Sequence, residues 1–142
     1  MGAKTKNHST NYVDTFIEVA EDTKAITGNK PPSKGDKKTV ANIQYDLISQ
    51  NPYTFTSDEV IFQVHADRND VTEAEYEEAR AQFLSKGQPC LRTSPLTKTY
   101  GFGIHCDSNG KIALYGKETE EYQKFLANDN IRKIKAMRST KK

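Results

Sequence analysis

Residues 100–115 constrain the fold of this chain more than any other stretch. Apolar residues alternate in them with small or polar ones, as in the two strands of a β-hairpin. Their sequence is YGFGIHCDSNGKIALY, and the Asn109–Gly110 pair is a strong turn signal. On both sides of this pair, large apolar residues alternate with smaller or polar ones. We therefore predict a hairpin over residues 99–116 with one apolar face.

The length of the loop decides which side chains share a face of this hairpin. A two-residue turn at Asn109–Gly110 would send the apolar side chains of the two strands to opposite faces. A three-residue loop, 108–110, gathers them on one face, and burial favours this register because a slip of one residue exchanges the faces. Gly110 would then adopt the left-handed conformation that such loops need. The shared apolar face comprises Phe102, Ile104, Cys106, Ile112 and Leu114.

The other face of the hairpin carries small side chains and two polar rings: Gly101, Gly103, His105, Ala113 and Tyr115. Glycine in a strand allows another group to approach the backbone closely. Two interpretations stay open. A ligand lies against this face, with His105 and Tyr115 as polar contacts, or the glycines serve close helix packing or strong twist.

The remaining elements follow from hydrophobic periodicity and helix caps. We predict strands at 12–20 and 131–137, a loop at 21–38, helices at 38–49, 57–67 and 72–86, an irregular stretch at 88–98, and a helix capped by Thr119. Residues 57–67 would also fit a strand, and 131–137 would also fit a helix. A capping box formed by Thr56 and Glu59 favours the helix at 57–67.

This order of elements predicts an α+β fold, because helices and strands do not alternate as βαβ units. We expect a small antiparallel sheet of about four strands, including the hairpin 99–116, packed with three to four helices. A chain of 142 residues fits one domain. The predicted organisation is a disordered segment at 1–10, a single α+β domain at 11–139 and a basic tail at 140–142.

Composition argues against a membrane or secreted protein. The chain is 35% hydrophobic and has no apolar run near 18 residues, so no membrane contact is expected. Its N-terminus has no apolar segment of the kind that secretory signals carry, so we predict a cytoplasmic location. In that compartment Cys90 and Cys106 are expected to be free, half-buried thiols.

The formal net charge of +2 hides an uneven distribution. Residues 57–80 are strongly acidic, whereas residues 130–142 carry basic side chains and no acidic one. Charge separated in this way favours an oriented partner or self-association, although a solvated helix face and a basic tail would give the same pattern.

Five segments together resemble one family: TFIEVA at 15–20, TSDEV at 56–60, KGQPCLRTSP at 86–95, YGFGIH at 100–105 and KAMRS at 135–139. The chain resembles an uncharacterised family of small bacterial proteins, classed as a domain of unknown function, from about residue 11 to residue 139. The resemblance implies a bacterial, cytoplasmic protein. It implies no activity, cofactor or catalytic residue.

The residues offer few groups for catalysis. A cysteine nucleophile needs a lowered pKa, and Cys90 is near Arg92 in sequence and could approach His105. Adjacent His105 and Cys106 point to opposite faces of one strand and cannot pair. Four residues could ligate a metal, but their spacing matches no metal motif, so none is predicted: His65, Cys90, His105 and Cys106. No cofactor is predicted either.

We therefore predict a binding or interaction domain for a small anionic ligand or a protein partner. Arg92, Lys98 and Arg138 would bind the anion, with His105 and Tyr115 as polar contacts. One alternative is a small enzyme that uses Cys90 or His105. A second is a nucleic-acid-binding accessory protein, which the acidic middle of the chain and its low net charge disfavour.

Overall fold

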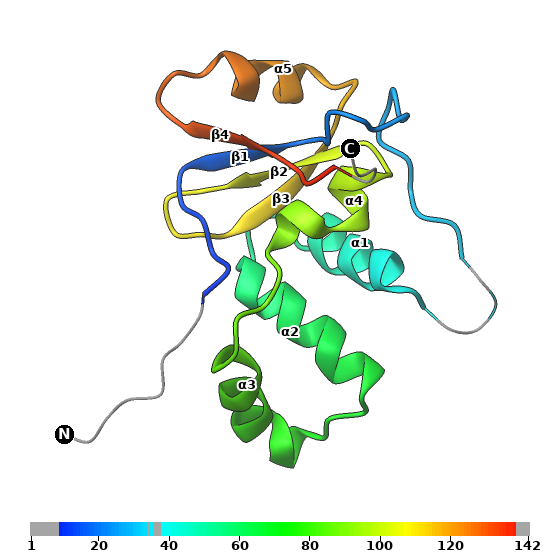
Figure 1. Ribbon diagram of the computed structural model, residues 1–142, viewed down its shortest axis with the longest axis vertical. Helices are drawn as coiled ribbons and strands as arrows, with labels where there is room; N and C mark the ends of the chain where they lie inside the picture. The colour runs from blue at the N-terminus through cyan, green and yellow to red at the C-terminus, as the bar shows by residue number, and fades with distance from the viewer. Residues whose placement is uncertain (1–8, 34, 36–37, 139–142) are drawn as a thin grey trace.

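A four-stranded sheet forms the centre of the computed structural model, which describes residues 9–33, 35 and 38–138 (Figure 1). The strand order is β3-β2-β1-β4. The strands are β1 (Thr15–Glu18), β2 (Phe102–Cys106), β3 (Ile112–Gly116) and β4 (Arg132–Lys135). The helices are α1 (Val40–Gln50), α2 (Ser57–Arg68), α3 (Tyr76–Leu84), α4 (Pro95–Lys98) and α5 (Glu120–Ala127). The α+β class is confirmed.

The sheet is mixed, whereas the sequence suggested an antiparallel one. Strands β1, β2 and β3 pair antiparallel, but β4 pairs with β1 in parallel. The reason lies in the connection after β3, which crosses one face of the sheet through α5 before it reaches β4 (Figure 1). A helical crossover returns the chain in its original direction, so the strand that follows is parallel to the strand before it.

The predicted three-residue hairpin loop is confirmed. Ile104 lies opposite Leu114 and Cys106 opposite Ile112, so the apolar side chains of both strands share one face. Asp107 N donates to Lys111 O at 2.9 Å and closes the loop. Gly110, with φ of 78°, adopts the left-handed conformation that this register requires.

The segment at 57–67, which fitted either a helix or a strand in the sequence, is helix α2. A capping box begins this helix. Thr56 Oγ1 accepts a hydrogen bond from Glu59 N at 3.3 Å, and Thr56 N donates to Glu59 Oε1 at 2.8 Å. The reciprocal bonds satisfy two amides that the first turn of a helix leaves without partners. The predicted helix at 72–86 is also present, as the 3₁₀ turn η1 (Glu73–Glu75) followed by α3.

The stretch at 88–98 is more regular than expected. It contains the 3₁₀ turn η2 (Leu91–Thr93) and the short helix α4. Ser94 Oγ accepts from Leu96 N at 3.1 Å, and Pro95 occupies the first turn, where its missing N–H costs nothing. Leu91 and Leu96 are buried in the core, which explains why this proline-rich segment is held in place.

Two apolar clusters cover the two faces of the sheet. Helices α1, α2 and α4 lie on the face that carries Ile17, Ile104 and Ile112. Helix α5 covers the other face, where Phe16 packs against Tyr122. A Cβ placed on Gly103 would lie 2.5 Å from Phe16 Cζ and 2.7 Å from Tyr122 Cε2. Of the two interpretations of the hairpin's glycine-rich face, the structure therefore favours close helix packing at this position.

The structure describes the predicted disordered segment at 1–10 only from Ser9 onward. Residues 1–8 and the predicted tail at 140–142 lie outside the described residues. Ser9 and Thr10, however, are held against α2, because Thr10 N and Thr10 Oγ1 each donate to Asp58 Oδ1 at 2.7 Å. Ser9 Oγ donates to Asp58 Oδ2 at 2.9 Å. Thr10 is consequently buried, with 6% of its surface exposed.

Candidate functional site

The predicted ligand-binding residues fall into separate groups in the structure. Arg92 and Arg138 line one cleft beside β4, although 45 residues lie between them in the chain. His105 and Tyr115 lie together on the face of the sheet that α5 covers. Lys98 is the last residue of α4 and lines neither place. The five residues therefore do not form a single site.

The cleft beside β4, called here the β4 cleft, has a volume of about 430 Å³. It is lined by Glu21, Arg92, Lys135, Ala136, Met137 and Arg138. Three positively charged side chains thus face one carboxylate, and Ala136 and Met137 add apolar surface. Met137 is 46% exposed, which is high for a large apolar side chain. The cleft combines positive charge with an accessible apolar wall.

Arg92 is fixed in this cleft at two points. Its backbone O accepts a hydrogen bond from Met137 N at 2.8 Å, and its Nε donates to Lys135 O at 2.6 Å. Buried Leu91 anchors the same 3₁₀ turn in the core. Because Nε is already engaged, the side chain is held in one orientation while its two terminal nitrogens keep their donors. Arg92 is therefore a preorganised donor for a carboxylate or phosphate.

Lys135 is paired within the cleft. Its Nζ lies 3.1 Å from Glu21 Oε2, and both side chains are about half exposed. Such surface ion pairs contribute little to stability, about 0–1 kcal/mol. An incoming anion can therefore compete with Glu21 for Lys135 at small cost.

The positive charge of the β4 cleft continues beyond its lining. Arg132 and Lys133 extend it along β4, next to the cleft. The acidic helix α3 lies at the opposite end, far from β4 (Figure 1). Helix α3 and strand β4, which belong to the two oppositely charged segments noted in the sequence, are thus separated in space.

The second group is centred on Tyr53, which sequence reasoning missed. Tyr53 Oη lies 2.9 Å from His105 Nδ1 and 2.7 Å from Tyr115 Oη. Tyr53 follows α1 and has φ of 58°, a left-handed conformation that is unusual for a bulky residue. Its N–H donates to Ile112 O at 2.8 Å, which ties this turn to the edge of β3. No local pattern in the sequence indicates that the turn reaches the hairpin.

This group, the Tyr53–His105–Tyr115 cluster, is electrically neutral near pH 7. Burial lowers the pKa of His105 below its ordinary value of 6.5, so the imidazole is uncharged. Burial and the hydrogen bond with Tyr115 raise the pKa of Tyr53. The His105 ring also stacks on Phe125 of α5, with centroids 4.2 Å apart. The cluster therefore joins the hairpin to α5 and supplies no positive charge.

The two cysteines are both free thiols in different surroundings. Cys106 is buried on the apolar face of the hairpin, and burial raises the pKa of its thiol to about 12. Cys90 is partly exposed, and its Sγ lies 3.5 Å from Tyr12 Oη. His105 and Cys106 lie on opposite faces of β2, as expected.

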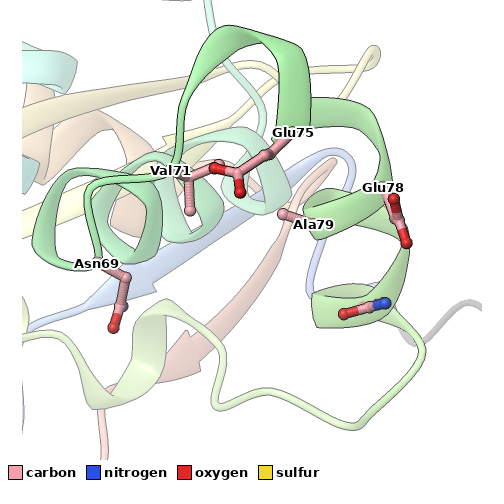
Figure 2. Close-up of a pocket in the computed structure, with 6 residues that line it drawn as sticks. Asn69, Val71, Glu75, Glu78 and Ala79 are labelled. Carbon is pink, nitrogen blue, oxygen red and sulfur yellow. The ribbon is translucent and has the colours of Figure 1, made fainter.

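A cavity of about 340 Å³ lies between the end of α2 and α3, where its lining is acidic (Figure 2). It is lined by Asn69, Val71, Glu75, Glu78, Ala79 and Gln82. Glu75 already accepts hydrogen bonds from Thr72 N and Thr72 Oγ1, which lower the pKa of its carboxyl group. In the described part of the chain, no group of three or more His, Cys, Asp or Glu residues could hold a metal ion. No helix in that part is long and apolar enough to cross a membrane.

Comparison with known proteins gives a family but no activity. Neither curated proteins nor solved structures yield a significant match to this chain. The model of DUF6157, described as a family of unknown function, matches residues 7–142. That range contains β4, the β4 cleft and the Tyr53–His105–Tyr115 cluster. The chain therefore belongs to DUF6157, a family whose function is unknown.

Proposed function

We propose that this protein is a binding domain for a ligand that carries a carboxylate or phosphate group, and that the β4 cleft holds that group. The proposal rests on one observation: Arg92 and Arg138 line the same cleft, and hydrogen bonds to the backbone of Lys135 and Met137 hold Arg92 in place. Arginine is suited to this task because its planar fork matches the two oxygens of an oxyanion.

The lining also suggests the shape of the ligand. Arg92 and Arg138 would bind the anionic group. Lys135 would release Glu21 and form an ion pair with this group instead. Exposed Met137 would contact an apolar part of the ligand. A ligand that places an apolar group beside its carboxylate or phosphate therefore fits better than a compact inorganic ion.

The other functions considered have less support. An enzyme based on Cys90 or His105 would need a cavity beside the reactive atom, and neither residue lines the β4 cleft. A nucleic-acid-binding protein would need a basic surface that follows several phosphates, whereas Glu21 interrupts the positive lining here. We also propose a cytoplasmic location, because a reducing compartment keeps thiols such as Cys90 and Cys106 free.

Calorimetric titration with succinate tests the proposal, and succinamide is the neutral control. We expect succinate to bind the wild-type protein and succinamide not to bind. Arg138→Gln, which removes an exposed charge from the cleft, should weaken succinate binding about 10-fold, the effect of one charge-assisted hydrogen bond. Lys124→Gln removes an exposed charge on α5 instead and should leave binding unchanged. Equal affinity for succinate and succinamide, or equal losses in both variants, would contradict the proposal.

A further inference from the structure

Strand β4 has an open edge beside the β4 cleft. It is the last strand in the order β3-β2-β1-β4, so within the described residues it has a strand neighbour on one side only. An edge strand presents unpaired N–H and C=O groups, which can pair with an added strand. The opposite edge of the sheet is partly covered, because Ile112 of β3 exchanges hydrogen bonds with Tyr53 and Phe55.

The pairing with β1 shows which backbone groups of β4 point outward. Arg132 N donates to Asp14 O, and Ala136 N donates to Glu18 O, both at 2.9 Å. In a parallel ladder the residues that pair with one neighbour alternate with residues that face away from it. The amides of Lys133 and Lys135 therefore point away from β1.

Arg92 already pairs with this outer edge much as a strand residue would. It accepts from Met137 N through its backbone O, and its side chain donates to Lys135 O. These bonds occupy the end of the edge nearest the β4 cleft. Among the described residues, none pairs with the part that runs from the Lys135 amide back along Lys133. A strand placed there would lead directly into the cleft.

Charge determines which strand can occupy this edge. Strand β4 carries Arg132, Lys133 and Lys135, and Arg92 and Arg138 lie at its end. Like charges placed opposite each other destabilise a strand pair, so a second copy of β4 is repelled. An extended segment with acidic side chains gains both the backbone hydrogen bonds and the ion pairs.

We infer that the ligand of the β4 cleft is an extended acidic peptide, which adds to the sheet as a fifth strand along Lys133 and Lys135 and places a carboxylate between Arg92 and Arg138. This inference rests on the proposed function and names its partner class. The peptide backbone would supply affinity, and its acidic side chains would supply the choice of partner.

Fluorescence anisotropy with a labelled, capped heptapeptide of alternating glutamate and valine tests the inference. The matched peptide has the same sequence with N-methyl groups on its three central amides, which keeps every charge but removes backbone donors. We expect the N-methylated peptide to bind at least about 10-fold more weakly, the effect of losing two hydrogen bonds. Equal binding of the two peptides would overturn strand addition, as would equal binding of a single-stranded oligonucleotide of the same net charge.

A pair of protein variants isolates the outer edge of β4. Lys133→Pro removes the outward amide without breaking the ladder with β1, because edge strands tolerate proline at such positions. Lys133→Gln removes the same charge and the same contact from Lys133 Nζ to Asn128 O, but keeps the amide. Lys133→Pro should bind the acidic peptide roughly 5-fold more weakly than Lys133→Gln. Equal affinities would overturn the inference.

Comparing succinate binding with peptide binding shows whether the inference alone is wrong or the proposed function is wrong as well. If succinate binds in an Arg138-dependent way but the peptide binds no more tightly than its N-methylated form, the cleft stands and strand addition is wrong. If neither succinate nor the peptide binds, the proposed function and the inference both fall.

Discussion

Replacing Gly103 with alanine should destabilise the protein, because the added methyl group has no room beneath α5. Its Cβ would lie 2.5 Å from Phe16 Cζ and 2.7 Å from Tyr122 Cε2, about 1 Å inside ordinary carbon–carbon contact. Neither ring can yield easily: Phe16 is fully buried, and Tyr122 Oη accepts from Val19 N at 3.0 Å. Overpacking of this kind costs about 2 kcal/mol of unfolding free energy.

The matched control is Gly87→Ala, because no atom in the described part of the chain lies within 4 Å of a Cβ at Gly87. This change should be neutral or stabilise by about 0.5 kcal/mol through the unfolded chain. Urea unfolding followed by circular dichroism measures both variants. Phe16→Leu removes the ring atom that the new methyl group meets, so Gly103→Ala should cost less in that background than in the wild type. Equal stability of Gly103→Ala and Gly87→Ala would refute the assigned packing of α5.

Three further predictions concern titration, reactivity and the N-terminal segment. Burial lowers the pKa of His105, so as the pH falls the unfolded chain binds a proton at this residue at a higher pH than the folded protein does. The free energy of unfolding should therefore decrease as the pH drops below 6.5. It should stop decreasing once the imidazole of the folded protein is also protonated. His105→Gln should reduce this slope in unfolding experiments across pH 4–8, and an unchanged slope would contradict the assignment. Iodoacetamide at pH 8, followed by peptide mass spectrometry, should modify Cys90 well before Cys106, since the Cys106 thiol is buried with a pKa of about 12; equal rates would argue against its burial. Asp58→Ala should lower the unfolding free energy by about 2 kcal/mol, because Thr10 N and Thr10 Oγ1 lose their acceptor, and an effect below about 0.5 kcal/mol would show that residues 9–10 are not held in solution.

Local signals predicted the hairpin and the longer helices well. The register of β2 and β3 follows from the apolar pattern, because a shift of one residue would have placed Ile112 and Leu114 on the face opposite Ile104 and Cys106. The reciprocal bonds of Thr56 and Glu59 involve residues three apart, so their types reveal the start of α2. In both cases the decisive interactions lie close together in the sequence.

The features that escaped prediction depend on distant segments. The parallel pairing of β4 with β1 results from the path of α5 across the sheet, which no residue of β4 specifies. Tyr53 reaches His105 through a turn with positive φ, a conformation that its residue type does not announce. Ser9 and Thr10 look like part of a polar tail until Asp58 is placed beside them.

Only some of the residues grouped in the sequence lie together in the structure, because this grouping too depends on contacts between distant segments. Arg92 and Arg138 do share a cleft, as their proposed common role required. His105 and Tyr115 were grouped with them, but the strand that carries His105 directs this side chain toward α5. Sequence reasoning placed both rings correctly on one face of the hairpin. It could not show that Arg92 reaches the edge of β4 instead of that face.

Amide chemical-shift mapping during a succinate titration of the ¹⁵N-labelled wild-type protein tests the central claim most directly. Anion binding in the β4 cleft predicts that the largest, saturable shifts belong to Arg92, Lys135, Met137 and Arg138, with little change around Tyr53 and His105. Shifts centred on Tyr53 and His105, or no saturable shift near Arg92 and Arg138, would contradict it.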